Sequence, residues 1–269
     1  MQTKFLWQEC SSDEIRAFAN SDAIVVIPTG SIEQHGPHLP VSTDSIIVSE
    51  ISRRAVHEAN KTTATLLLPT IMYGYSLHHM EFPGTISLSD ETYVALLTEV
   101  GTCVTQHGFR RLIFLNGHGG NKAPLQLAIQ RIHRRSKNRS LCVAATYWDL
   151  IRKDVQACRH SPPGGISHAG EFETSVLMSL YPEMVKTECI AKSLPNIGDK
   201  DFDYDWYSAS NISLAFQVSE FSPTGVLGDP TVANAEMGSA MMAAAVKKIS
   251  EFIVRIGQWS IPPDTPNRM

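Results

Sequence analysis

Four side chains that can bind a metal ion lie close together near the start of the chain, in the segment GSIEQHGPHLPVSTD that begins at Gly30. They are Glu33, His35, His38 and Asp44. Oxygen and nitrogen donors without a thiolate suit Zn²⁺, Mn²⁺ or Fe²⁺ better than a soft metal. Surface loops are commonly polar as well, so the rest of the sequence has to distinguish a metal site from a solvated loop.

Two later motifs carry the same residue types. His118 stands between glycines in NGHGGN, where the backbone can turn sharply and approach a bound group closely. His168 and Glu171 lie three residues apart in SHAGEFETS, and that spacing places both on one face of a helical turn. Acids at a helix start can simply complement the helix dipole. That role would explain one glutamate in the motif, but not His168.

The first two of these motifs, at Gly30 and at His118, follow short apolar runs that read as buried strands. Strands are predicted at residues 23–27, 65–68, 112–115 and 141–147. Helices are predicted at residues 45–60, 90–108, 122–135, 171–180 and 234–256. This alternation indicates parallel βαβ units. Ligands bind outside the carboxyl ends of the strands in such sheets, so these two motifs are expected to meet at one edge.

Together these side chains could form a two-metal hydrolytic site. A carboxylate such as Asp44 can bridge two cations, each completed by a histidine and a glutamate. Asp44 also precedes a predicted helix, and serving as its N-cap is the alternative role. Two metals roughly 3.5–4 Å apart polarise a carbonyl oxygen and turn a bridging water into hydroxide near neutral pH. An uncoordinated histidine would protonate the departing nitrogen, so the set predicts hydrolysis of a carbon–nitrogen bond.

Composition limits the class of protein. The chain has 269 residues, 43% of them hydrophobic and 19% charged, which is ordinary for a globular protein. We expect a single domain over residues 1–269. The net charge of −4 and the absence of a Lys/Arg-rich tract argue against a nucleic-acid partner. Five scattered cysteines, no signal peptide and no membrane-spanning apolar run predict a cytoplasmic protein without a membrane partner.

Four segments of the chain resemble the motifs of the creatininase family. In chain order they are GSIEQHGPHLPVSTD, FPGT, NGHGGN and HAGEFETS. The resemblance runs from about Trp7 to Tyr181, and more loosely to the last predicted helix. It implies a three-layer α/β/α fold around a mainly parallel central sheet. It also implies two divalent metal ions (Zn, Mn or Fe), hydrolysis of an amide, and a homo-oligomer that is commonly a hexamer.

The resemblance also assigns roles to individual residues. It places the metal ligands at Glu33, His35, Asp44, His118 and Glu171. Asp44 would bridge an ion held by Glu33 and His118 and an ion held by His35 and Glu171. Creatinine-hydrolysing members use a glutamate two residues after the NGH histidine, which is Gly120 here, whereas other branches use the HAGE glutamate. His168 matches the proton-transferring histidine, and His38 is expected to lie behind the ligands or at the surface.

The predicted substrate pocket departs from that of creatinine-hydrolysing members. An aromatic residue after the NGH histidine is replaced by Gly119, and a tryptophan four residues before His168 is replaced by Gly164, although Trp148 matches the other pocket tryptophan. Creatinine is therefore not the expected substrate, and the glycines leave room for something larger. The candidate substrate contacts are Tyr75, His78, Gly119 and Trp148. A part for His78 or His79 in catalysis is left open.

Three functions remain open at this point. The first is a metal-dependent amidohydrolase that cleaves a non-peptide amide, lactam, formamide or ureido bond of a small molecule. This class includes deformylases of ring-opened pyrimidine nucleotides. Arg110, Arg111 or Lys122 would contact the phosphate of such a substrate. The second is a peptidase that trims a short peptide. The third is a non-catalytic metal-binding protein of the same fold.

The segment at residues 192–210 is expected to be irregular, at the surface or at the rim of the pocket.

Overall fold

The computed structural model describes residues 4–137, 139–195, 199, 201–208 and 212–261. In this part of the chain a four-stranded parallel sheet lies at the centre, with the strand order β2-β1-β3-β4. The strands are β1 (Ile24–Thr29), β2 (Thr65–Leu67), β3 (Arg111–Asn116) and β4 (Leu141–Thr146). Strands β1 to β3 are buried along their whole length, which explains their nearly continuous apolar sequences. The four predicted strands are confirmed, with ends shifted by at most two residues.

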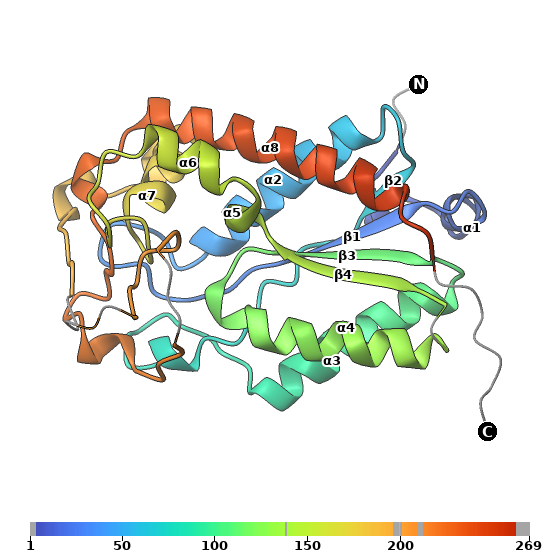
Figure 1. The fold of residues 1–269 in the computed structure, drawn as a ribbon, viewed down its shortest axis with the longest axis horizontal. Helices are drawn as coiled ribbons and strands as arrows, with labels where there is room; N and C mark the ends of the chain where they lie inside the picture. The colour runs from blue at the N-terminus through green and yellow to red at the C-terminus, as the bar shows by residue number, and fades with distance from the viewer. Residues whose placement is uncertain (1–3, 138, 196–198, 200, 209–211, 262–269) are drawn as a thin grey trace.

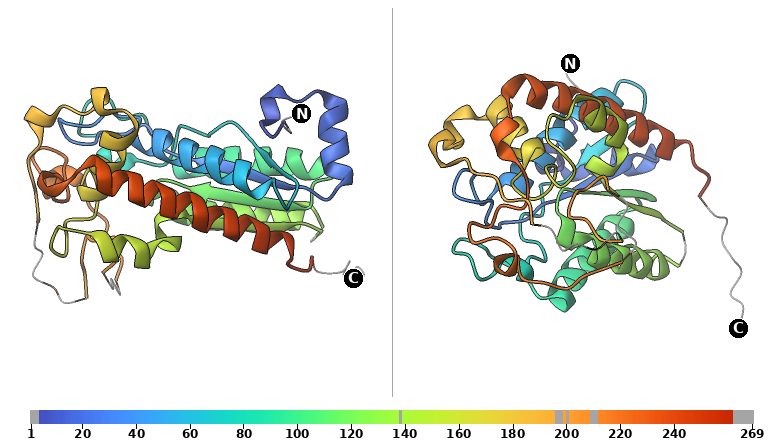
Figure 2. Two further views of the ribbon diagram at one scale, coloured as in Figure 1. Left: turned by 90° about the horizontal axis from the view of Figure 1, so that it is seen from above. Right: turned by 60° about the vertical axis from the view of Figure 1, so that its left-hand side comes forward.

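Helices cover both faces of the sheet and complete three layers (Figures 1 and 2). One face carries α2 (Thr43–Ala59), α7 (Glu171–Leu180) and α8 (Ala235–Gly257), and the other carries α3 (Asp90–Gln106) and α4 (Lys122–Arg135). Side chains of β1 alternate between the two cores, as the two-residue period of a strand requires. Val26 packs on the α2 and α8 side, and Val25 on the α3 and α4 side. The predicted α/β/α architecture is therefore confirmed.

Shorter elements complete the described chain. Helix α1 (Ser12–Asn20) begins with a capping box in which Ser11 accepts from the Glu14 backbone and Glu14 accepts from the Ser11 backbone. Helices α5 (Tyr147–Leu150) and α6 (Arg152–Cys158) were not expected from the sequence, because they are too short for a clear helical period. The 3₁₀ turns are Trp7–Glu9, Leu77–His79, Gly119–Asn121, Pro182–Met184, Thr187–Cys189, Val218–Glu220 and Pro230–Val232.

The strand order opens a crevice between the carboxyl ends of β1 and β3. Thr29 at the end of β1 pairs with Asn116 at the end of β3. From β1 the chain passes through α2 to β2 on one side, and from β3 through α4 to β4 on the other. Such a switch point is where open α/β sheets bind ligands. The described parts of the long segment between α7 and α8 lie at the left in Figure 1.

None of the helices in the described part of the chain combines the length and the apolar character that crossing a lipid bilayer requires.

Candidate metal centre

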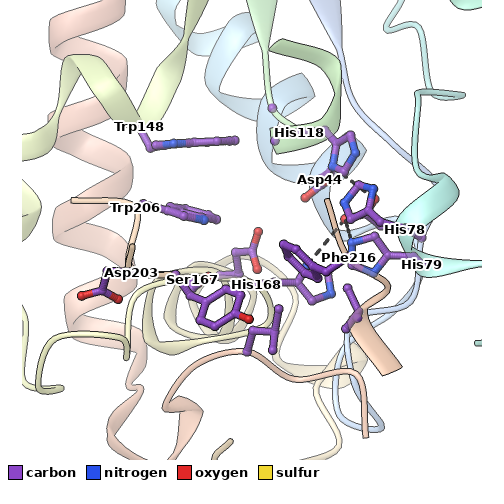
Figure 3. A pocket seen from close by; sticks show the side chains of 17 residues that line it. Asp44, His78, His79, His118, Trp148, Ser167, His168, Asp203, Trp206 and Phe216 are labelled. Atoms are coloured by element: carbon purple, nitrogen blue, oxygen red, sulfur yellow. Dashed lines mark ion pairs between the residues drawn. The ribbon is translucent and has the colours of Figure 1, made fainter. Parts of the chain in front are cut away.

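Four of the predicted ligands come together at the crevice. Glu33 and His35 lie on the loop after β1, Asp44 in the first turn of α2, and His118 on the loop after β3. Each of these residues is at most 3% exposed. Figure 3 shows Asp44 and His118 next to each other in the wall of a cavity. The parallel sheet therefore brings side chains from distant parts of the sequence to one buried point.

Asp44 connects two pairs of side chains. One of its oxygens, Oδ2, lies 3.0 Å from Nδ1 of His118, which is 3.1 Å from Glu33 Oε2. The other oxygen, Oδ1, lies 3.2 Å from Nε2 of His35, which is 3.6 Å from Oε1 of Glu173. Asp44 is not the helix cap: the N-cap of α2 is Ser42, and no side chain caps this helix. The two oxygens of one carboxylate thus face two separate histidine–glutamate pairs.

Backbone carbonyls fix the tautomers of both histidines. Nε2 of His118 donates to the carbonyl of Tyr75 at 3.0 Å, and Nδ1 of His35 donates to the carbonyl of Glu33 at 3.1 Å. A carbonyl oxygen can only accept, so these ring nitrogens carry the protons. When either ring gives up its second proton, as a histidine must to bind a metal ion, the lone pair of the opposite nitrogen faces the carboxylates. This is the arrangement in which histidine binds metal ions.

Several buried polar atoms of this cluster have no hydrogen-bond partner among the described residues. They include Glu33 Oε2, His35 Nε2 and Asp44 Oδ2. Buried polar atoms are normally paired, so atoms that converge without hydrogen bonds suit a cation held by oxygen and nitrogen ligands. Burial opposes charge on His118, but Glu33 and Asp44 outweigh it and raise the pKa of His118 to about 10. The same negative potential would attract a divalent cation.

The structure corrects one predicted ligand. Glu171 is fully buried, but its carboxylate accepts hydrogen bonds from the backbone N–H groups of His160 (2.7 Å) and Ser161 (2.9 Å) and from the Ser161 hydroxyl. Glu173 faces His35 instead. Helix α7 begins only at Glu171, so His168 precedes the helix and the expected three-residue spacing on one face does not apply. Residues two apart on a helix point in nearly opposite directions, which separates the roles of the two glutamates.

His168 lies beside the cluster, with its side chain 12% exposed to the cavity. Nε2 donates to the backbone carbonyl of Gln34 at 2.7 Å, which leaves Nδ1 at 3.5 Å from Glu33 Oε1. Burial, together with repulsion from two neighbouring histidines, lowers the pKa of His168 well below its usual range. The ring is therefore neutral in the ion-free protein, with Nδ1 free to accept a proton.

His78 and His79, whose roles the sequence left open, both line the cavity. His79 is 3% exposed, and its Nε2 lies 3.6 Å from Glu33 Oε1. Burial lowers the pKa of His79 to about 3. The ring of His78 stacks on that of His118, with centroids 5.7 Å apart and an interplanar angle of 14°. His38 is buried and bonds Thr174 Oγ1 through Nε2 at 3.0 Å, so it lies behind the cluster and not at the surface.

Donor atoms converge in more than one combination. Three groups have donor atoms that all lie within 4.8 Å of one another: Glu33, His35 and Asp44; His35, His168 and Glu173; and Glu33, His79 and His168. In the described part of the chain these three groups are overlapping candidate cation sites around the cluster.

The cavity above the cluster has a volume of about 240 Å³ and aromatic walls. Trp148, as predicted from the sequence, lines it and stacks on Trp206 with ring centroids 4.3 Å apart (Figure 3). Trp206 was missed, although it lies in the segment expected at the pocket rim. Gly119 also lines this cavity. Tyr75 does not line it; its carbonyl supports His118, and it belongs to a neighbouring cavity.

The three basic residues named as candidate phosphate contacts lie elsewhere. Arg110 and Arg111 both pair with Asp22, which precedes β1, at the opposite end of the sheet from the cluster. Lys122 pairs with Asp149 at 3.0 Å over the ring of Trp148. Among the described residues that line the cavity there is no lysine or arginine. The structure therefore offers no support for a phosphate contact there.

Comparisons with known proteins identify the family of this chain. The family model described as creatininase, or creatinine amidohydrolase, matches residues 8–253. A mycofactocin precursor peptide peptidase of Mycobacterium tuberculosis is 35% identical over 254 residues, covering 89% of this chain and 87% of the relative. A creatinine amidohydrolase of Pseudomonas putida is 28% identical over 191 residues, covering 66% and 72%. A solved mutant creatininase of Zn-Zn type aligns with a TM-score of 0.81 and 25% identity, over 97% of this chain and all of that one. This chain therefore belongs to the creatininase family.

Proposed function

We propose that this protein is a dinuclear metal-dependent hydrolase of carbon–nitrogen bonds. Asp44 would bridge two divalent ions (Zn, Mn or Fe), one completed by Glu33 and His118 and the other by His35 and Glu173. The observation that carries the proposal is that the two oxygens of Asp44 face separate histidine–glutamate pairs. When bound, two such ions polarise an amide carbonyl and activate water for attack on it.

His168 is proposed to transfer the proton. Its Nε2–H is held by the carbonyl of Gln34, so the free Nδ1 points toward Glu33 at the floor of the cavity. Nδ1 can accept a proton there and deliver it to the nitrogen of the cleaved amide. Once protonated, this nitrogen departs as a neutral amine. The hydrogen bond to Gln34 keeps the ring in one orientation during both transfers.

We further infer that the substrate is a peptide and not a compact small-molecule amide. The identity to peptide peptidases supports this, because it extends over 89% of the chain. The lining supports it as well: among the described residues it combines aromatic rings and carboxylates and has no lysine or arginine to pair with the phosphate of a nucleotide. A bare Gly119 leaves space for a chain to continue beyond the cavity.

A peptide screen tests the function. The full chain, loaded separately with Zn²⁺, Mn²⁺ or Fe²⁺, is incubated with a mixed-sequence peptide library, creatinine and a panel of formamides, and products are identified by mass spectrometry. We expect cleavage of peptides, loss of cleavage with a chelator, recovery on adding metal back, and no turnover of creatinine. A protein without stoichiometric metal that cleaves nothing would refute the hydrolase. Turnover confined to the formamides would refute the peptide substrate alone.

The two glutamates of α7 provide a matched pair of variants. Glu173→Gln should reduce the bound metal from two ions per chain to one, because Glu173 faces His35 on one side of the bridge. Glu171→Gln should keep both ions, because its carboxylate binds the backbone at residues 160–161. It should still lower the free energy of unfolding by about 1–3 kcal/mol, since the amide NH₂ would face a buried N–H. Elemental analysis and urea unfolding measure the two effects, and the reverse pattern of metal loss would restore Glu171 as the ligand.

A further inference from the structure

A second cavity opens directly beside the first. It has a volume of about 680 Å³ and shares three lining residues with the first cavity: His78, Gly119 and Phe216. Because the ring of His78 stacks on that of His118, the boundary between the two cavities begins next to a proposed metal ligand. A molecule bound at the metal centre could therefore extend into both cavities.

The lining of the second cavity is apolar and has room for a ligand. Leu77 and Leu214 are each 42% exposed there. Among the described residues that line it, the one carboxylate is that of Glu220, which accepts a hydrogen bond from the backbone N–H of Gln217. No lysine or arginine is found in this described lining. Such a surface favours an uncharged apolar group.

Gly119 keeps the passage between the cavities open. A Cβ atom at Gly119 would meet no atom within 4 Å, and its φ is not positive, so neither packing nor backbone conformation requires glycine. The next residue differs: a Cβ at Gly120 would lie 2.1 Å from the carbonyl oxygen of Tyr75 and 2.6 Å from His118 Nε2. Packing within the protein explains Gly120, whereas Gly119 leaves free space at the boundary.

We propose that the second cavity binds an apolar side chain on one side of the scissile amide, while the group on the other side lies against the Trp148–Trp206 pair. This inference rests on the proposed hydrolase. The substrate class is then a linear peptide with apolar residues on both sides of the cleaved bond. A compact ring would leave the second cavity empty.

Two phosphinates serve as probes, because a tetrahedral PO₂ group in place of the amide binds divalent ions and resembles the transition state. One carries an isobutyl group on one side and a methyl group on the other; the second carries isobutyl groups on both sides. Calorimetric titration of the metal-loaded full chain should give a dissociation constant about tenfold lower for the second probe, as expected for burying one leucine-sized side chain. Gly119→Leu should reduce this ratio to below about twofold, because the leucine fills the passage.

Leu127→Gln is the control, since Leu127 is 52% exposed on α4 and lines neither cavity; it should keep the tenfold ratio. Leu214→Ser, in the second cavity, should lower the ratio independently of Gly119. Equal affinities of the two probes for the wild-type protein, or an unchanged ratio in Gly119→Leu, would overturn the inference while leaving the hydrolase intact. Failure of the hydrolase proposal is visible separately, as wild-type protein without stoichiometric metal, and would overturn both.

Discussion

Asp44→Ala is expected to release both metal ions and to lower kcat/KM about a thousandfold, since a bound metal contributes several kcal/mol to the transition state and each 1.4 kcal/mol is tenfold. Asp44 contacts both histidine–glutamate pairs, His118 through Oδ2 and His35 through Oδ1. Loss of one histidine or glutamate would leave the other histidine–glutamate pair complete. Loss of Asp44 removes one carboxylate oxygen from both proposed metal sites. Elemental analysis after gel filtration measures the ions, and hydrolysis of the peptide identified in the screen measures kcat/KM.

Asp13→Ala is the matched control for this variant. Asp13 pairs with Arg16 on the surface of α1, where its side chain is 87% exposed, and such pairs contribute little to stability. The control should retain both ions and full turnover. If Asp44→Ala also kept two ions per chain and its activity, the proposed bridge would be refuted.

Much of the fold could be predicted because its signals are local. Apolar runs of strand length gave the four strands, and their polar continuations marked the carboxyl ends where Glu33, His35 and His118 lie. A parallel sheet brings such ends together whatever the distance in sequence. The family motifs then indicated the architecture and the four predicted ligands that the structure brings together.

The proposed role of Glu173 in place of Glu171 could not be predicted, because it depends on where α7 begins. Between His168 and the helix, Ala169 adopts a φ of 55°, which a residue with a Cβ rarely adopts. Its N–H donates to Oε2 of Glu173 at 2.6 Å. Local preferences do not place alanine in this conformation, and so the helix start and the direction of each glutamate are set by the folded surroundings.

Trp206 was missed for a different reason. It lies in an irregular segment whose position is fixed by the neighbouring Asp205, a buried carboxylate that pairs with Arg159 at 2.7 Å and accepts from the Gly164 N–H at 2.8 Å. These contacts join residues more than 40 positions apart in the sequence. Neither spacing nor propensity reveals them, and the composition of the segment indicated no more than a pocket rim.

His168→Ala is expected to keep both metal ions and to lower kcat by about 10²–10⁴-fold, the usual contribution of a positioned acid–base group. His168 lies within reach of two possible metal groups, one with Glu33 and His79 and one with His35 and Glu173. A ligand and a proton carrier therefore cannot be told apart by activity alone. Metal content separates them: the proposed role leaves two ions in the variant, whereas a ligand would take at least one ion with it.

A control for this variant comes from His57, a histidine whose side chain is 46% exposed on α2. His57→Ala should retain both the ions and kcat. His168→Gln distinguishes a supporting role of the ring from proton transfer. The glutamine amide can restore the hydrogen bond to the Gln34 carbonyl, but it cannot carry a proton between water and the departing nitrogen. If the ring only supported the loop, His168→Gln would recover most of the lost kcat. If His168 transfers the proton, the glutamine variant stays as slow as the alanine variant while it binds metal and phosphinate like the wild-type protein.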